Sequence, residues 1–307
     1  MSDGPFFAGV DGGGTKTVVV IVDRLRRERA RVRTGSSNAA VVGHEEAAST
    51  LRDALVRAAV EANATLPLGG VWLGLAGSDR PEDHHRLRPA LVNVAGSIRF
   101  SNDAELVLGA LPDGVGVALV AGTGSIAIGV DRRGVRARTG GWGHIFSDEG
   151  SGYDVTRKML RAFAREADGR GPATRLTGRL TEHFQLSEPH QIIARVYAPS
   201  MTKGGLASLC RIVAEEAEAG DEVAMGIITS TADDLADLGH VVAGRLGFPG
   251  GFDLAVTGGL FIHMASFRCQ VMRTLGQRWA ISTQTIVRDP ALTAARALAS
   301  AGGNHHG

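Results

Sequence analysis

The sequence predicts an α/β protein with two domains, each built around a mixed β-sheet. Three observations support this prediction. The 307 residues exceed what one typical hydrophobic core needs. A strand, a glycine-rich turn and a second strand occur at 7–20, and the same pattern returns at 117–130. Strand-like and helical patterns also alternate between these two segments, as expected of a sheet with helical crossovers.

The first part of the chain, residues 6–101, carries short apolar runs typical of strands and two stretches of helical periodicity. Their order is β-β-β-α-β-α-β. Three antiparallel strands followed by αβ crossovers predict a mixed sheet. The strands are expected at Phe6–Val10, Thr17–Val22, Arg29–Arg33, Val71–Leu75 and Ile98–Ser101, and the helices at His44–Ala62 and Asp83–Val94.

A domain boundary is expected near residue 112. A short helical run at 104–111 ends there, and the turn Pro112-Asp113-Gly114 leads into the second strand–turn–strand segment. The predicted domains are therefore 1–112 and a larger one at 113–307. Packing of the last helix against the first domain is an alternative to packing within the second.

The second half begins in the same way as the first, which indicates a weak internal repeat. Three strands are expected up to Arg138, and the region from Asp148 to about Gly247 has largely helical periodicity. Two repeated sheets facing a cleft would present both glycine-rich turns to one ligand. The remaining elements are expected as strands at Leu254–Thr257 and Thr283–Val287 and as helices at Leu260–Leu275 and Leu292–Ala299.

Composition excludes several classes of protein. Hydrophobic residues make up 44% and charged residues 21%, as in a folded globular protein. The formal net charge of +1 gives no electrostatic basis for binding nucleic acid or an anionic membrane surface. No uninterrupted run of about 18 apolar residues occurs, and no signal-like apolar segment begins the chain, so a cytoplasmic protein is expected. Cys210 and Cys269 lack metal-ligand spacing and are expected to be reduced thiols.

The turn at 11–17 has the composition of a phosphate-binding loop. Glycine lets backbone N–H groups approach an anion, Thr15 and Thr17 add hydroxyl donors, and Asp11 can hold Mg²⁺ through water. Lys16 does not make this a Walker A loop, because no glycine immediately precedes the lysine and β-branched residues rather than a helix follow it. An ordinary glycine-rich hairpin turn is the structural alternative.

The turn Gly122-Thr123-Gly124-Ser125 repeats this arrangement. The spacing Gly122-x-Gly124-x-x-Ala127 imitates a dinucleotide-binding fingerprint, but a strand follows the turn where a Rossmann fold requires a helix. Two hairpins rich in glycine and hydroxyl groups can instead hold a nucleoside triphosphate from opposite sides.

Five sequence blocks occur in an order that resembles a known family. This order is similar to that of the N-acetylglucosamine kinase and BadF/BadG/BcrA/BcrD-type ATPase family, within the sugar kinase and actin superfamily. The resemblance covers residues 6–300 and implies two ribonuclease H-like (actin-like ATPase) domains with mixed five-stranded sheets facing an interdomain cleft. The blocks are Asp11-Gly-Gly-Gly-Thr15, Ser101-Asn102-Asp103, Gly122-Thr123-Gly124-Ser125, the segment from Gly140-Gly141-Trp142 to Asp148-Glu149-Gly150-Ser151, and Thr257-Gly258-Gly259.

The resemblance implies a role for residues in each block. Asp103 resembles the catalytic base, which accepts the proton of a sugar hydroxyl as that oxygen attacks the γ-phosphorus of ATP. Asp11 is implied to hold Mg²⁺. The implied ATP-binding residues are Gly12, Gly13, Gly14, Thr15, Lys16, Thr123, Gly124, Gly258 and Gly259, and the implied substrate-binding residues are Asn38, Asp103, Thr123, Gly141 and Asp148.

Structural roles are the alternative for several of these residues. Asp103 also suits a helix N-cap, and Asp148 and Glu149 suit the first turn of a helix, where the helix dipole favours carboxylates. Trp142 can stack on a sugar or belong to the core. His144 is expected to position other groups by hydrogen bonding, because Asp103 already fills the role of the base.

The implied function is ATP- and Mg²⁺-dependent phosphorylation of an amino sugar, N-acetylglucosamine to its 6-phosphate, with glucosamine as the alternative substrate. The expected partners are the amino sugar and ATP, and binding to nucleic acid or to a membrane is not expected. Both a monomer and a homodimer agree with the sequence. An ATPase activator of a partner enzyme is a second class, but such activators hold an iron–sulfur cluster with glycine-flanked cysteines, a setting that Cys210 and Cys269 lack. A sugar-responsive regulator would need a DNA-binding module, which neither charge nor spare length provides.

Overall fold

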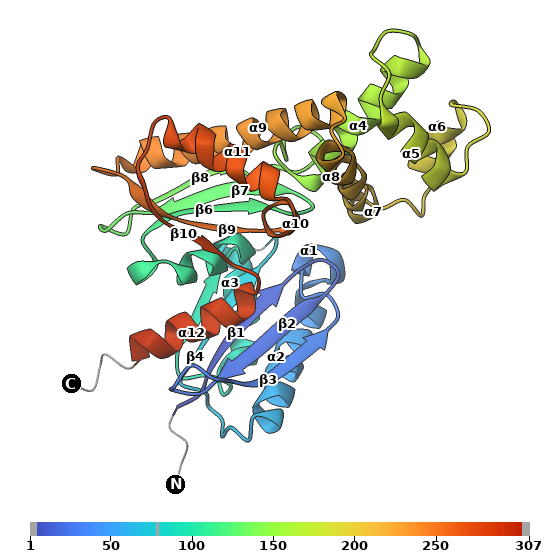
Figure 1. Ribbon diagram of the computed structural model, residues 1–307. Coiled ribbons are helices and arrows are strands. Elements are labelled where there is room, and N and C mark those ends of the chain that lie inside the picture. The colour runs from blue at the N-terminus through green and yellow to red at the C-terminus, as the bar shows by residue number, and fades with distance from the viewer. Residues whose placement is uncertain (1–4, 78–79, 303–307) are drawn as a thin grey trace. The chain divides into compact units, whose positions relative to one another are not determined.

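The computed structural model describes residues 5–77 and 80–302, and the chain divides into two compact units (Figure 1). The first unit is Met1–Val115 with Val287–Gly307, and the second is Gly116–Ile286. These units differ from the expected ranges 1–112 and 113–307 mainly at the C-terminal end, because the segment that begins at Val287 belongs to the first unit. The second unit is therefore an insertion between two parts of the first.

The first unit contains a mixed five-stranded sheet with the strand order β3-β2-β1-β4-β5. β1, β2 and β3 pair in antiparallel fashion, whereas β4 is parallel to β1 and β5 is parallel to β4. All five expected strands are confirmed with small changes at their ends. They are β1 Phe7–Gly12, β2 Thr17–Val22, β3 Glu28–Thr34, β4 Gly70–Leu75 and β5 Ile98–Ser101.

Helices cover both faces of this sheet. In β2, successive side chains point to opposite faces and so pack in two different cores. Val19 and Ile21 pack in one core with buried residues of helix α2, whereas Val20 and Val22 pack in another core with alanines of helix α12. A continuous run of β-branched residues suits a strand buried on both faces. The helices of this unit are α1 Ala39–Val42, α2 His44–Glu61, α3 Pro81–Leu87 and α12 Pro290–Gly302, with short 3-10 helices at Arg88–Leu91, Asp103–Ala110 and Pro112–Gly114.

Helix α12 lies against β1 so closely that only glycine fits at position 9. A Cβ atom at Gly9 would lie 1.9 Å from the carbonyl oxygen of Ala291 and 2.8 Å from the amide nitrogen of Ala295. Alanines on the facing side of α12, including Ala291 and Ala295, are fully or almost fully buried. Small residues on both sides therefore allow helix backbone to approach strand backbone.

The continuous helix expected at Asp83–Val94 is wrong. α3 ends at Leu87 and a 3-10 helix, Arg88–Leu91, follows. Pro89 explains the break, because proline has no N–H to continue the α-helical hydrogen bonds.

The second unit repeats the sheet of the first, with the strand order β10-β9-β6-β7-β8. β6, β7 and β8 are antiparallel, whereas β9 is parallel to β6 and β10 is parallel to β9. The weak internal repeat of the sequence is thus a repeat of topology. The strands are β6 Gly116–Ala121, β7 Ser125–Val130, β8 Arg136–Gly140, β9 Phe252–Thr257 and β10 Ile281–Ile286.

The expected helical region of the second unit is confirmed, and Figure 1 shows its longest helix, α9, running along the sheet beside α11. The helix expected at Leu260–Leu275 is two helices, because Met264 adopts an extended conformation between them. The helices are α4 Gly152–Ala167, α5 Arg175–Phe184, α6 Gln191–Val196, α7 Lys203–Ser208, α8 Cys210–Glu218, α9 Glu222–Leu246, α10 Gly259–His263 and α11 Ala265–Gly276.

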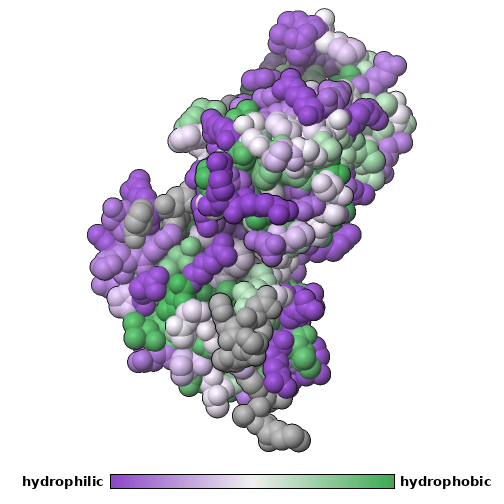
Figure 2. Space-filling view, turned by 90° about the vertical axis from the view of Figure 1, so that its left-hand side faces the viewer, coloured by the Kyte–Doolittle hydropathy of each residue, from purple (hydrophilic) through white to green (hydrophobic). Residues whose placement is uncertain are grey.

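On the face shown in Figure 2, hydrophilic residues are interleaved with small hydrophobic groups over both units. Within residues 5–77 and 80–302, no helix combines the length and the apolar character that crossing a membrane requires.

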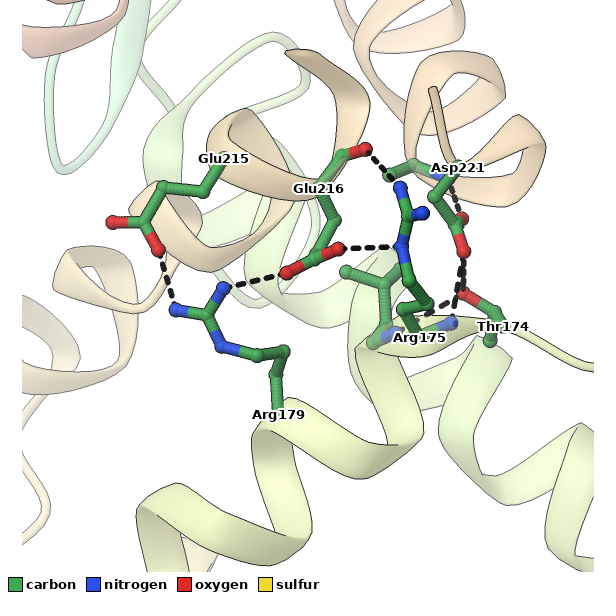
Figure 3. Close-up of polar contacts among 8 residues, drawn as sticks. Thr174, Arg175, Arg179, Glu215, Glu216 and Asp221 are labelled. Atoms are coloured by element: carbon green, nitrogen blue, oxygen red, sulfur yellow. Dashed lines mark hydrogen bonds and ion pairs between the residues drawn. The ribbon is translucent and has the colours of Figure 1, made fainter. Parts of the chain in front are cut away.

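A buried polar network fastens α5 to the loop between α8 and α9 (Figure 3). Asp221 is the N-cap of α9 and accepts a hydrogen bond from the Ala224 N–H. The same carboxylate accepts bonds from the Thr174 hydroxyl and the Arg175 N–H. Burial acts to raise the pKa of Asp221, but the hydrogen bonds from the Ala224 and Arg175 N–H groups and from Thr174 outweigh it and lower the pKa. One carboxylate thus joins the starts of two helices.

We expect Asp221→Asn to lower the free energy of unfolding by about 2 kcal/mol at pH 7, because two backbone donors and a hydroxyl lose a charged acceptor. The lowered pKa means that the wild-type carboxylate stabilises the fold above its ordinary pKa and loses this effect as the pH falls through the folded-state pKa. Urea unfolding at several pH values should show the difference shrinking below about pH 4. The control is Asp168→Asn, since Asp168 pairs with Arg170 at the surface and its side chain is 54% exposed. Equal effects of the two substitutions would contradict the prediction.

Candidate functional site

Asp11 is the second-to-last residue of β1 and Asp103 follows β5, so both carboxylates lie at the carboxyl end of the parallel strands of the first sheet. The register pairs Asp11 with Gly74 of β4 and Gly74 with Ser101 of β5. Neighbouring strands are about 4.8 Å apart, so this row spans about 10 Å. Asp103 comes just after the end of β5 and is half-buried. The register therefore brings the expected base and the expected metal-binding carboxylate to the same edge.

Asp103 begins the 3-10 helix Asp103–Ala110, whose place on the sheet is set by Leu106. Leu106 packs directly over Gly74, where a Cβ atom would lie 2.4 Å from the Leu106 Cγ atom. Asn102 is the N-cap of this helix and accepts a hydrogen bond from the Ala104 N–H at 3.0 Å, while Asp103 Oδ1 shares the same donor. The N-cap position considered for Asp103 thus belongs to Asn102.

The glycine-rich turn between β1 and β2 has an exposed tip and a braced base. Residues 14–16 are exposed. The Ser36 hydroxyl donates a hydrogen bond to the Gly13 carbonyl at 3.1 Å. A Cβ atom at Gly12 would lie 2.3 Å from Ser37 Oγ, so this position has room only for glycine. A rigid turn with exposed backbone at its tip is a geometry that binds anions.

Asn38, the expected sugar ligand of the first unit, is the N-cap of α1. Its Oδ1 atom accepts a hydrogen bond from the Ala40 N–H at 2.9 Å. Its amide nitrogen lies beside the backbone of two glycines, 4.0 Å from a Cβ built at Gly14 and 3.1 Å from one built at Gly77. The capping bond uses the oxygen, and the nitrogen is the end that faces the glycine-rich turn.

Asp11 is poorly stabilised as an anion. Burial is the main cause that raises its pKa to about 6, and the charges of Asp103 and Asp289 add to the rise, while Lys16 opposes it. Asp289 is absent from the expected site residues. Its carboxylate pairs with Arg31 at 2.6 Å, and its position directly before Pro290 reads in the sequence only as a helix start.

In the second unit, Ser125 connects three of the expected segments. Its N–H donates to Asp148 Oδ1 at 3.2 Å, and its hydroxyl donates to the Glu149 carbonyl at 2.5 Å. Its own carbonyl accepts from the Gly141 N–H at 3.0 Å. A Cβ atom at Gly124 would lie 2.8 Å from Asp148 Oδ1. The structure therefore places Gly124, Gly141 and Asp148 side by side.

Asp148 is buried and adopts a left-handed backbone conformation, with φ of 67°. α4 begins only at Gly152, with Ser151 as its N-cap, so the first-turn role considered for Asp148 and Glu149 is wrong. The Asp148 Oδ2 atom pairs with Lys203 Nζ at 2.7 Å. Lys203 lies in α7, and nothing in its local sequence indicated this contact.

The turn after β9 packs against the turn after β6. Gly258 has a φ of 102°, and a Cβ atom there would lie 2.2 Å from the Ala121 carbonyl oxygen and 2.7 Å from the Gly122 nitrogen. By contrast, within residues 5–77 and 80–302, no atom beyond the chain neighbours of Gly259 and the backbone of its helix lies within 4 Å of a Cβ built there. Gly258 therefore permits close backbone contact, and Gly259 borders open space at the start of α10.

The other residues of the second unit lie at its surface or beside the Ser125 network. Thr123 is exposed at the tip of its turn. The Trp142 side chain is 68% exposed, which excludes the core role considered for it. His144 contacts the Tyr153 ring edge-on, with 5.1 Å between ring centroids. The expected site residues thus form one group in each unit.

Comparison with known proteins identifies the family. The profile of the BadF/BadG/BcrA/BcrD ATPase family matches residues 8–284. The chain belongs to this family.

Among related proteins, this BadF-family chain is 35% identical over 269 residues to an N-acetyl-D-glucosamine kinase of Dictyostelium discoideum, covering 82% of this chain and 84% of that protein. It is 33% identical over 234 residues to an N-acetylmuramic acid/N-acetylglucosamine kinase of Clostridium acetobutylicum, covering 75% and 76%. Its fold matches the crystal structure of a candidate N-acetylglucosamine kinase from Chromobacterium violaceum, with a TM-score of 0.73, 21% identity and coverage of 96% and 98%. The fold is that of the actin-like sugar kinases.

The residues of this BadF-family protein fit a magnesium ion bound mainly through water and phosphate. Within residues 5–77 and 80–302, no cluster of three or more His, Cys, Asp or Glu side chains has the geometry to hold a metal by itself. Mg²⁺ usually takes one or two carboxylates and fills its other positions with water and phosphate oxygens. Burial and, to a lesser extent, the charges of Asp103 and Asp289 raise the pKa of Asp11, and a bound cation would favour its ionised form.

We expect Asp11→Asn to stabilise the apoprotein at pH 8 by up to about 3 kcal/mol, because it removes a poorly stabilised charge. The folded-state pKa of about 6 lies above the ordinary 3.8, so ionised Asp11 destabilises the fold fully above pH 6. The stabilisation should therefore shrink as the pH falls through 6 and vanish below 3.8. Thermal unfolding from pH 4 to pH 8 measures this, with Asp53→Asn on the exposed face of α2 as the control. A variant no more stable than wild type at pH 8 would overturn the prediction.

Proposed function

We propose that the protein transfers the γ-phosphoryl group of ATP to the 6-hydroxyl of an amino sugar, with N-acetylglucosamine as the substrate and glucosamine as the alternative. The observation that carries the proposal is that Asp11 and Asp103 lie at the same end of the parallel strands of the first sheet, beside a glycine-rich turn with an exposed tip. Curated relatives across most of the chain include two kinases of N-acetylated amino sugars and a glucosamine kinase of Vibrio cholerae. We further propose a cytoplasmic protein whose partners are these two small molecules.

Asp103 acts as the general base in this proposal. Its carboxylate accepts the proton of the sugar hydroxyl as that oxygen attacks the γ-phosphorus. Leu106, packed on Gly74, holds the start of the 3-10 helix and therefore the position of this carboxylate. Asp11 would hold Mg²⁺, which when bound neutralises charge on the phosphates of ATP.

The two glycine-rich turns bind the nucleotide in this proposal. Residues 12–16 and the turn at Thr123 and Gly124 offer backbone N–H and hydroxyl donors to the phosphates. Gly258 and Gly259 form the surface for the adenosine, which agrees with the open space beside Gly259.

Sugar binding is assigned to Asn38, Thr123, Gly141 and Asp148. The support for Asp148 and Gly141 is their shared attachment to Ser125, which places a carboxylate directly beside the second turn. Asn38 offers its amide nitrogen at the first turn.

ATP hydrolysis without sugar should be slow, and ADP formation should rise at least about 100-fold with N-acetylglucosamine. The reason is that the sugar hydroxyl is the nucleophile that the site aligns with the γ-phosphorus of ATP. Coupled measurement of ADP release across a panel of hexoses and amino sugars tests this. If no sugar stimulates ADP release, the kinase proposal fails, and hydrolysis stimulated by a protein partner would instead indicate an activator.

Asp103→Asn should reduce kcat by at least about 100-fold while nucleotide affinity stays close to that of wild type. Asparagine keeps the size of the side chain but cannot accept the proton. The matched control is Asp113→Asn, an exposed residue with φ of 54°, a conformation that asparagine also adopts. Normal turnover by Asp103→Asn, or loss of ATP affinity in place of turnover, would show that another group is the base.

A further inference from the structure

Lysine is rare in this chain, and two of its lysines, Lys16 and Lys203, belong to the candidate site. Of 33 Lys and Arg residues, the only lysines are Lys16, Lys158 and Lys203. Arginine supplies a planar fork, whereas lysine supplies a compact charge on a flexible stem. Lysine at position 203 therefore supplies a single compact cation on a flexible stem.

Lys203 compensates the charge of Asp148. Its Nζ atom lies 2.7 Å from Asp148 Oδ2, and the Ser125 N–H occupies Oδ1 at 3.2 Å. The Asp148 side chain is only 4% exposed, whereas the Lys203 side chain is 33% exposed. Both carboxylate oxygens thus have partners, and the lysine is the more accessible member of the pair.

The elements around this ion pair hold it in place. Thr202 caps α7 by accepting the Gly205 N–H, which fixes the start of the helix that carries Lys203. The Thr156 hydroxyl of α4 donates to the Leu206 carbonyl at 2.8 Å and ties α7 to α4. On the other side, Gly124 has no side chain, and its backbone can therefore lie directly against the Asp148 carboxylate. These contacts hold the Lys203–Asp148 ion pair in one position in the second unit.

We infer that Lys203 is a specificity residue that disfavours sugars with a protonated 2-amino group and favours sugars whose 2-substituent is neutral. This inference rests on the proposed function. A buried ammonium group needs an anionic partner, and the charge of Asp148 is already compensated. The neighbouring Glu149 carboxylate accepts a bond from the Ser147 hydroxyl at 3.3 Å, with which a substrate ammonium would have to compete. A neutral N-acyl group needs no counter-charge.

The test compares kcat/KM for N-acetylglucosamine and for glucosamine in wild type and in Lys203→Met, which keeps the stem and removes the charge. Wild type should prefer the N-acetylated sugar by at least about 30-fold, and Lys203→Met should narrow this ratio at least about 10-fold, because the substrate ammonium can then pair with Asp148. Lys203→Arg, which keeps the charge, should retain most of the preference. Arg195→Met removes an exposed charge in α6 and should leave the ratio unchanged.

The outcomes separate the two proposals. If wild type phosphorylates neither sugar, the proposed function fails. If wild type phosphorylates N-acetylglucosamine but Lys203→Met lowers both kcat/KM values equally, Lys203 is only structural and the inference is overturned. The wild-type ratio tests the inference without any variant, since equal or better use of glucosamine would also overturn it.

Discussion

The parallel pairing of β1 with β4 and of β4 with β5 is the constraint on which the first half of the site depends. Parallel strands end at the same edge of a sheet, so residues that follow them are brought together without any direct bond between them. Asp11 and Asp103 meet in this way. The position of Asp103 also depends on Gly74, which leaves room for Leu106 and therefore for the 3-10 helix that begins at Asp103.

The site carboxylates of the two units, Asp11 and Asp148, differ in how their charge is compensated. In the first unit, burial and neighbouring acids leave Asp11 with a raised pKa of about 6, a situation that suits a mobile cation supplied from outside. In the second unit, Asp148 has a lysine of the same chain at 2.7 Å. A charge that the protein compensates itself is suited to orienting a neutral ligand, whereas an uncompensated one is suited to recruiting a metal.

Most of the fold follows from local patterns, and the site follows only in part. β-branched runs such as Thr17–Val22 predict strands because the signal lies within the strand, and Pro89 explains the broken helix in the same local way. The break at Met264 has no such residue. The contact between Lys203 and Asp148 joins positions 55 apart, and the influence of Asp289 on Asp11 depends on the return of the chain to the first unit. Neither leaves a trace in nearby sequence.

Helix α12 has a consequence for the order in which the protein folds during synthesis. The face of the first sheet formed by Phe7, Val20 and Val22 is covered by a helix made after the whole second unit, and Arg296 of that helix donates to the Arg26 carbonyl across 270 positions. The ribosome therefore releases the second unit before the first can close. Until then the apolar face formed by Phe7, Val20 and Val22 has no helix of its own chain to cover it, so the nascent first unit exposes apolar surface longer than the second.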